Sequence, residues 1–301
     1  HLRTVGVEPV TRYTAQPVGR VFAPQGLGER MRVYREEAPR LGQMAAREAL
    51  AEADVRADQI DVLLTVSCTG YMVPALDVGL AAGLGLRSDV IRLPLTELGC
   101  SGGGAALAAA HRHLRLEPRQ RVLVVCVELC SLTFQPGDTS VDNMTAALVF
   151  GDGAAAAVLT GEPGGLEVLA TATRLISGSD RLLGFDLRDD GFHPVLDRRL
   201  PRLIEQELAG ALAGFGEGQF DFFAIHAGGP RIFDAVERGL GLGPGHLDPS
   251  RSAFSRYGNL SSASLLFVLG ELRQGSPGIG LSLAFGPGVT VEMATLRRSP
   301  G

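Results

Sequence analysis

The sequence predicts an α/β fold built from two related halves. Apolar runs typical of buried strands alternate with helical patterns along nearly the whole chain, which is the pattern of an α/β protein. The order of these segments in the first half recurs in the second half. The 301 residues, 45% of them hydrophobic, are enough to bury a large core.

The first half contains most of the predicted strands. Apolar residues at helical spacing in RLGQMAAREALAEADV predict a helix, and short apolar runs rich in β-branched residues, such as RVLVVCVELC, predict buried strands. The turn ELGCSGGG leads into a long alanine-rich helix. In chain order we expect a helix at 40–55, a strand at 58–70, a helix at 75–86, a strand at 90–95, a turn and helix at 97–116, and strands at 121–130 and 150–161.

The second half repeats this order. We expect a helix at 202–215, a strand at 221–230, a helix at 231–242, a turn and helix at 257–275, a strand at 278–288 and a last strand that follows the FGPG turn. Superposing the halves pairs Cys68 with His226 and Cys100 with Asn259, because 100 − 68 = 32 and 259 − 226 = 33. An internal duplication follows, with halves at 1–162 and 163–301 and a cleft where their loops meet.

Composition excludes several classes of protein. A net charge of −5 and a pI near 5.7 leave no broad basic face for nucleic acid. No apolar run reaches the roughly 20 residues that span a bilayer, and the first residues lack the pattern of a secretion signal. Four cysteines are too few for a disulfide framework in a chain this long and favour a reducing cytoplasm.

The glycine turn at Cys100 predicts a nucleophile. Backbone N–H groups and the dipole of the following helix favour a thiolate there, and the flanking glycines allow a substrate to approach closely. Taken alone, His226 is typical of a structural histidine and Asn259 of a helix cap. The duplication brings both residues to the same cleft as Cys100. Together they suit acyl transfer followed by decarboxylation.

The chain resembles the chalcone-synthase-like type III polyketide synthases of the thiolase superfamily. The strings ELGCSGGG, IHAGGPRI, YGNLSSAS, FGDGAAA and AFGPGVTVE are similar to that family's signature segments, in the same order and at fitting separations. The resemblance covers nearly the whole chain and implies a thiolase-like αβαβα layered fold. It places Cys100, His226 and Asn259 at the catalytic triad and Phe150 at the gatekeeper position.

The chemistry that this resemblance implies is iterative condensation of malonyl-CoA onto a starter taken from an acyl-CoA. An imidazolium at His226 would hold Cys100 as a thiolate, which takes up the starter acyl group. Decarboxylation of malonyl-CoA then leaves an enolate, stabilised by His226 and Asn259, that attacks the thioester. No metal and no cofactor are expected, because the CoA thioesters are substrates.

The resemblance also places residues that shape the starter and the product. Phe185 is bulkier than the glycine of plant chalcone synthases and predicts a small starter. Cys68 in VSCTGYMVP is similar to bacterial enzymes that make tetrahydroxynaphthalene from malonyl-CoA alone; an alkylpyrone or resorcinol is the other expected type of product. The expected cavity residues are Cys68, Thr69, Cys130, Thr133, Ala146, Phe185 and Ser261.

Contacts at the edge of the site follow from the same resemblance. Arg231 is expected to contact the CoA phosphates. Val73 stands where, in the family, a residue crosses the dimer interface into the partner's cavity, so a homodimer is expected.

The remaining candidate residues are interpreted as structural or solvated. His193 and His246 lie in polar turn regions and are interpreted as solvated, whereas Cys126 is interpreted as a core residue.

Other classes of protein fit the sequence less well. A ketoacyl-carrier-protein synthase III would share Cys, His and Asn but would stop after one condensation on a carrier protein. Papain-like proteases have an aromatic residue, usually Trp, near the nucleophile, and this chain has no Trp. A nucleotide-binding module is disfavoured because GDGAAAAV lacks the lysine of a P-loop.

Overall fold

A computed structural model describes residues 2–8, 17–215 and 220–299. Its strands form a nine-stranded mixed sheet and a separate two-stranded hairpin, β7-β8. The strands are β1 (Leu2–Glu8), β2 (Val62–Ser67), β3 (Ile91–Thr96), β4 (Arg121–Leu129), β5 (Asp152–Thr160), β6 (Leu166–Leu175), β7 (Leu183–Arg188), β8 (Gly191–Leu196), β9 (Phe222–Ile225), β10 (Gly278–Gly286) and β11 (Thr290–Arg298). The α-helices are α1 (Val18–Val21), α2 (Leu27–Glu52), α3 (Leu76–Leu84), α4 (Gly102–Leu116), α5 (Val141–Val149), α6 (Leu200–Ala211), α7 (Pro230–Leu240), α8 (Asp248–Tyr257) and α9 (Ser264–Leu272).

Both halves of the chain arrange their strands in the same way. The first half has the order β2-β4-β5-β1 and the second half the order β9-β10-β11-β6. In each, the first pair is parallel and the other pairs are antiparallel. The two runs meet where β1 touches β6, and β3 adds an edge strand beside β2. The predicted α/β fold of two duplicated halves is therefore confirmed.

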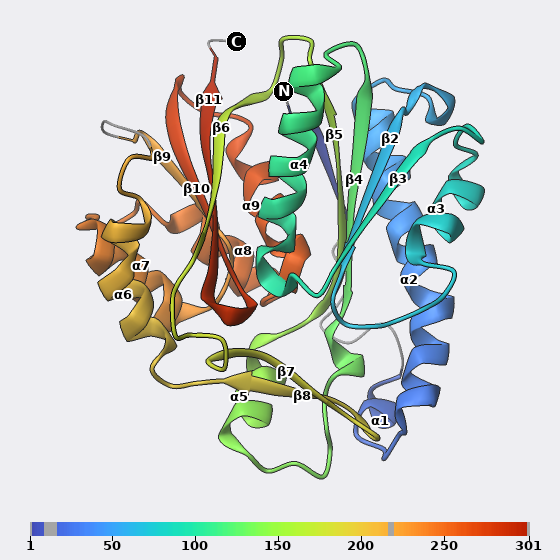
Figure 1. The fold of residues 1–301 in the computed structure, drawn as a ribbon, viewed down its shortest axis with the longest axis vertical. Coiled ribbons are helices and arrows are strands. Elements are labelled where there is room, and N and C mark those ends of the chain that lie inside the picture. The colour runs from blue at the N-terminus through green and yellow to red at the C-terminus, as the bar shows by residue number, and fades with distance from the viewer. Residues whose placement is uncertain (1, 9–16, 216–219, 300–301) are drawn as a thin grey trace.

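The helices form layers around the two wings of the sheet (Figure 1). Helices α4 and α9 lie between the wing that contains β2, β4 and β5 and the wing that contains β9, β10 and β11. Helices α2 and α3 cover the outer side of the first wing, and α6 and α7 cover the outer side of the second. The order across the molecule is helix, sheet, helix, sheet, helix, as the resemblance implied.

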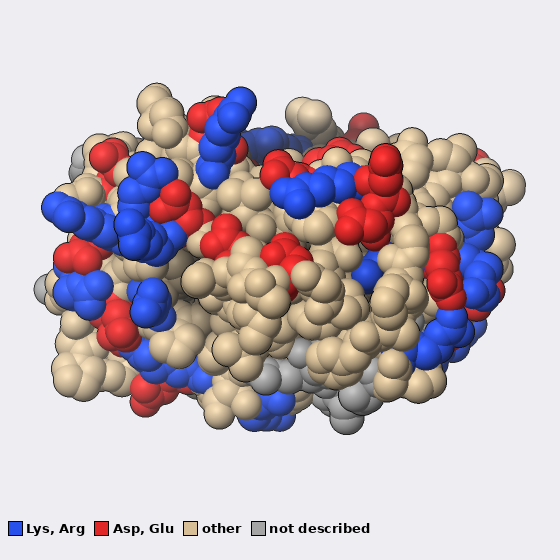
Figure 2. Space-filling model, turned by 90° about the horizontal axis from the view of Figure 1, so that it is seen from below, with Lys and Arg blue, Asp and Glu red and all other residues tan. Residues whose placement is uncertain are grey.

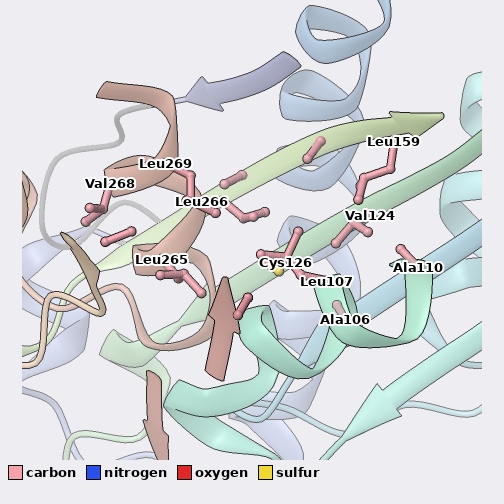
Figure 3. Packing of buried hydrophobic residues seen from close by; sticks show 14 of the residues in the cluster. Ala106, Leu107, Ala110, Val124, Cys126, Leu159, Leu265, Leu266, Val268 and Leu269 are labelled. Atoms are coloured by element: carbon pink, nitrogen blue, oxygen red, sulfur yellow. The ribbon is translucent and has the colours of Figure 1, made fainter. Parts of the chain in front are cut away.

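Each helical layer has its own apolar core. The central core joins α4 and α9 to the facing strands of both wings, and Figure 3 shows Leu107, Val124 and Leu266 meeting in it. Cys126 is fully buried in this core, so its interpretation as a core residue is confirmed. Separate clusters lie under α2 and α3 and under α6 and α7. Strands buried on both faces explain why the sequence shows continuous apolar runs rather than alternation.

Helix α2 begins much earlier than the sequence predicted. We expected a helix at 40–55, but the structure has Leu27–Glu52, with Pro39 inside it. Arg30 is fully buried on the inner face, with Val33 and Tyr34 on the same side. A buried arginine interrupts the apolar spacing in the sequence, and this hid the first turns of the helix. No described helix is both long and apolar enough to cross a membrane.

The first turn of α4 packs closely against the second half of the chain, and a substitution in this turn tests that packing. A Cβ atom at Gly103 would lie 2.4 Å from the carbonyl oxygen of Ser262. We therefore expect Gly103→Ala to lower the free energy of unfolding by about 1–3 kcal/mol, as overpacking does. Chemical denaturation measures this change.

Gly210→Ala is the matched control. Gly210 also lies within a helix, α6, but nothing described lies within 4 Å of a Cβ built there. The same substitution should raise stability by up to about 1 kcal/mol. Equal effects of the two substitutions would contradict the close packing at α4.

Candidate active site

Cys100 lies in the short turn that begins α4. The turn Gly99–Ser101 is a single 3-10 turn, and α4 follows at Gly102. Gly99 has a φ of 53°, a left-handed conformation that a glycine adopts without strain. A Cβ atom there would also lie 2.6 Å from Cδ of Pro287. The turn thus holds the Cys100 side chain at the seam between the two halves, where the thiol stays partly accessible.

Asn259 approaches Cys100 from the second half. Its backbone N–H donates to the Val149 carbonyl, and its own carbonyl accepts from the Gly151 N–H, which makes an isolated parallel bridge to Phe150. Its side-chain Oδ1 accepts the Ser261 N–H at 2.8 Å, and both Oδ1 and Nδ2 lie 3.9 Å from the Cys100 Sγ, with Nδ2 as the atom that can donate. The amide can therefore donate to a negative charge that forms beside the sulfur.

His226 follows the last residue of β9. Its backbone N–H continues the sheet by donating to the Leu283 carbonyl at 2.8 Å. The side chain is 2% exposed, and neither ring nitrogen has a hydrogen-bond partner among the described residues. A buried polar atom without a partner is costly to keep, and such groups concentrate at functional sites. The imidazole is thus free to accept a proton or to bind a substrate oxygen.

Burial acts on both members of the predicted ion pair. It lowers the pKa of His226 to about 3 and raises the pKa of Cys100 to about 12, with Ser261 and Asn259 opposing the second shift. Each group alone is therefore neutral near neutral pH. No hydrogen bond joins the two side chains within the described part of the chain, so the imidazolium–thiolate pair stays a prediction.

A pocket opens beside Cys100, and residues from both halves line it. Its walls are formed by Cys68, Thr69, Gly99, Cys100, Cys130, Thr133, Phe150, Leu183, Gly184, Phe185, Pro194, Leu196, Ser261 and Pro287. Eight of the residues named from the resemblance are in this wall: Cys68, Thr69, Cys100, Cys130, Thr133, Phe150, Phe185 and Ser261.

Five of the named residues are not part of this wall, and two of them, His226 and Asn259, are buried. Ala146 is half-buried on α5, outside the pocket wall. Arg231 is exposed and lines an outer groove between α6 and α7. Val73 is 71% exposed beside the cis peptide bond to Pro74, in a loop near the edge strand β3.

The sequence analysis missed the hairpin that closes the pocket. Leu183 pairs with Leu196 across β7 and β8, and Phe185 pairs with Pro194, so four neighbouring side chains of the hairpin line the pocket. The two short segments LGFDLR and GFHPVL around the turn DD could have indicated a hairpin.

His193 was interpreted as solvated, and this was wrong. It is 7% exposed on β8, between Asp190, 2.9 Å from its Nε2, and Asp138, 3.4 Å from its Nδ1. Because the residues around His193 are polar, the sequence did not indicate that this segment packs against α5. His246 is exposed, as expected.

Glu128 is a polar side chain that lies behind the pocket wall. It is fully buried and accepts from the Thr69 hydroxyl at 2.9 Å, the Ser262 hydroxyl at 2.5 Å and the Cys68 N–H at 3.1 Å. Burial raises the pKa of Glu128, and these donors oppose the shift. Ser261 in turn contacts two of the three cysteines of the pocket wall, with its Oγ 3.4 Å from the Cys68 Sγ and 3.7 Å from the Cys100 Sγ.

The polar groups at the thiol suit acyl transfer through a cysteine. A nucleophile lines the partly open pocket, and an amide lies 3.9 Å from its sulfur, whereas the buried imidazole of His226 is not part of the pocket wall. Over the ranges that the structure describes, no group of three or more His, Cys, Asp or Glu residues is placed to hold a metal ion.

Comparisons with known proteins identify the family. The model for the N-terminal domain of chalcone and stilbene synthases matches residues 15–163, and the model for their C-terminal domain matches residues 167–300. The 1,3,6,8-tetrahydroxynaphthalene synthase of Streptomyces coelicolor is 36% identical over 94% of this chain and 79% of its own length. The phloroglucinol synthase of Pseudomonas fluorescens is 34% identical over 94% of this chain and 84% of its own length.

Solved structures agree with this result. The crystal structure of the tetrahydroxynaphthalene synthase from Streptomyces coelicolor, described as a bacterial type III polyketide synthase, matches with a TM-score of 0.90 at 34% identity, over 95% of this chain and 85% of that chain. A type III pentaketide synthase from Neurospora crassa matches with a TM-score of 0.82 at 29% identity, over 92% of this chain and 83% of that chain. The chain belongs to the chalcone and stilbene synthase family of type III polyketide synthases, which have a thiolase-like fold.

Proposed function

We propose that this enzyme builds a polyketide by repeated decarboxylative condensation of malonyl-CoA on Cys100. The observation that carries the proposal is the arrangement at the Cys100 sulfur. The amide of Asn259 faces it and the pocket opens beside it, and His226 supplies a buried imidazole without a hydrogen-bond partner among the described residues. The proposed steps need only CoA thioesters and protein side chains.

Loading begins with proton transfer from Cys100 to His226. Because burial favours the neutral form of each group, we infer that the proton moves as the thioester enters. The sulfur attacks the thioester carbonyl, the bond to CoA breaks, and the CoA thiolate takes the proton from His226. The acyl group is then held on Cys100 as a new thioester.

Extension uses the same groups on malonyl-CoA. When the carboxylate leaves as CO2, its bonding electrons form an enolate, and the developing charge on the thioester oxygen is stabilised by Asn259 Nδ2 and by His226. The enolate carbon attacks the Cys100 thioester and releases the sulfur. The product is a chain longer by one two-carbon unit on CoA, which can return to Cys100 for another cycle.

The pocket favours small starters. Phe185 and Leu183 of the hairpin narrow it. Cys68, Thr69, Cys130 and Thr133 also line it. We propose malonyl-CoA or a short acyl-CoA as the starter and, by analogy with the relatives, 1,3,6,8-tetrahydroxynaphthalene or a pyrone or resorcinol as the product.

The outer groove between α6 and α7 suits the phosphates of CoA. Arg198, Arg202 and Arg231 are exposed in it and form no ion pair with a described residue, whereas Arg238 is paired with Glu205. Figure 2 shows basic side chains gathered at the left of the lower face, on the side of α6 and α7 in Figure 1. Arg198 lies two positions after Leu196, a pocket residue, so the groove and the pocket are neighbours along the chain.

A homodimer is the proposed assembly, in the cytoplasm. The edge strand β3 is exposed, and its Ile91 and Leu93 are 44% and 40% exposed. Val73 and Tyr71 add apolar surface in the loop beside it. An exposed apolar edge strand is suited to pairing with another chain. A monomeric mass in analytical ultracentrifugation would contradict the dimer.

The proposed compartment, the cytoplasm, agrees with the cysteines. The four cysteines are free, which suits a reducing compartment.

Incubation with malonyl-CoA, followed by mass spectrometry of the products, tests the activity. We expect CoA release and products containing more than one malonyl-derived unit. Cys100→Ala should lower turnover by more than about 10³-fold because the acyl carrier is lost. A single condensation, seen only with a carrier protein, would support a ketoacyl-carrier-protein synthase III activity instead.

The pH dependence of Cys100 alkylation tests the role of His226. Burial, only partly opposed by Ser261 and Asn259, raises the pKa of Cys100 to about 12, so a thiolate at lower pH requires a proton acceptor such as His226. In His226→Ala, the midpoint of the iodoacetamide reaction rate against pH should therefore move upward from that of the unmodified protein. Peptide mapping separates Cys100 from the other cysteines. Identical midpoints would remove His226 from the proton transfer.

Steady-state kinetics test the arginine groove. Arg202→Ala should raise KM for malonyl-CoA roughly three- to tenfold and leave kcat nearly unchanged, because the phosphates take no part in the bond changes. Arg199→Ala is the control, since Arg199 is equally exposed but pairs with Asp197 at 2.7 Å. Equal KM values for the two variants would place the phosphates elsewhere.

A further inference from the structure

The hairpin that closes the pocket is not part of the main sheet. β7 and β8 pair only with each other among the described strands. An isolated two-stranded hairpin is at best marginally stable in water. Its position over Cys100, and therefore the size of the pocket, must depend on contacts that it makes with the rest of the chain.

Gln135 makes the most deeply buried polar contact with the hairpin. Its side chain is 4% exposed, and its Nε2 donates to the backbone carbonyl of Phe192 on β8 at 3.0 Å. The ring of Phe192 packs edge-on against Phe185, with ring centroids 5.7 Å apart. Because Phe185 lines the pocket, the hydrogen bond from Gln135 reaches the pocket wall through a single aromatic contact.

The other end of Gln135 is held by Arg30 of α2. Arg30 is 1% exposed, and its Nη2 donates to the Gln135 Oε1 at 3.2 Å. Its Nη1 donates to the Leu132 and Phe134 carbonyls, each at 2.8 Å. The guanidinium therefore fixes both the segment that carries Gln135 and the orientation of its amide, leaving Nε2 as the group that points to the hairpin.

Two further contacts hold β8, but both involve more exposed groups. The Leu196 N–H donates to Asp142, which is half-buried on α5, and His193 contacts Asp138, whose side chain is 25% exposed. Exchange with water weakens polar contacts at such positions. Gln135 itself is 4% exposed and is held by the buried Arg30, so we infer that its contact constrains the position of β8 most tightly.

The packing around Gln135 supports this role. A Cβ atom at Gly191, the first residue of β8, would lie 2.7 Å from the Gln135 Nε2. The hairpin backbone thus lies directly against the amide, with no room for a side chain between them. Displacement of the amide would displace β8 itself.

We propose that Gln135, held by Arg30, is a positioning residue that sets the distance of the β7-β8 hairpin from Cys100 and so limits the size of acyl group that the pocket accepts. This inference rests on the polyketide chemistry proposed above. Gln135 does not touch the substrate. It acts through Phe192 and Phe185, and loosening it should widen the pocket without altering Cys100, His226 or Asn259.

The decisive variant is Gln135→Glu. The carboxylate still accepts from Arg30, so the buried guanidinium keeps its partner, but it cannot donate to the Phe192 carbonyl and repels that oxygen. Gln135→Met, similar in length but without polar atoms, removes both contacts. Arg188→Ala is the matched control, because Arg188 lies on the same hairpin, is exposed and forms an ion pair with the exposed Asp186.

The first readout is independent of turnover. Cys100 is alkylated with iodoacetamide and with an aryl-substituted iodoacetamide, and the ratio of the bulky to the small rate is measured by peptide mapping. In Gln135→Glu this ratio should rise roughly fivefold, as the loss of one buried hydrogen bond allows. Arg188→Ala should leave it unchanged.

The second readout uses turnover. The ratio of kcat/KM for a long acyl-CoA starter to that for a short one should rise in Gln135→Glu by a similar factor, with longer-starter products visible by mass spectrometry. If the unmodified enzyme releases no CoA, the proposed function fails, and the alkylation ratio still decides the role of Gln135.

The outcomes separate positioning from simple stabilisation. Thermal melting shows which variants remain folded. An unchanged alkylation ratio in a folded Gln135→Glu or Gln135→Met variant would overturn the proposal. Loss of the fold in both variants would mark Gln135 as a structural residue only and would overturn it as well.

Discussion

The close contact between the start of α4 and the second half of the chain is the constraint on which the active site depends. Gly103 lies against the Ser262 carbonyl, and Gly104 lies against Glu292 of β11. Only residues without side chains allow the first turn of α4 to approach this surface. The contact fixes the turn that carries Cys100 relative to the segment that carries Asn259, so neither half can form the site alone.

The same seam joins the pocket to the fold of both halves. The backbone bridge between Phe150 and Asn259 connects the end of α5 to the segment before α9. A residue of the pocket wall and a residue that faces the nucleophile are therefore held by one pair of backbone hydrogen bonds. Movement of one half against the other would disturb the pocket and the chemistry together.

Polar groups around the thiol divide into those that are fully bonded and those that are free to act. Glu128 and the Oδ1 atom of Asn259 accept several hydrogen bonds and have a structural role. The Asn259 Nδ2 group contacts only the Cys100 sulfur, at 3.9 Å, and the His226 ring nitrogens have no hydrogen-bond partner among the described residues. Since buried polar groups are normally paired, these free groups are where a substrate oxygen or proton is best accommodated.

The sequence by itself determined the layered α/β fold, the duplication and the approach of Asn259 to Cys100. Periodic burial and glycine turns leave a local pattern, as in the continuous apolar run of β4. Only the tertiary structure decided the early start of α2, the burial of His193, the hairpin wall and the contact between Gln135 and Phe192. These features depend on pairs of residues far apart in the chain, and a contact between distant residues imposes no periodicity on either segment.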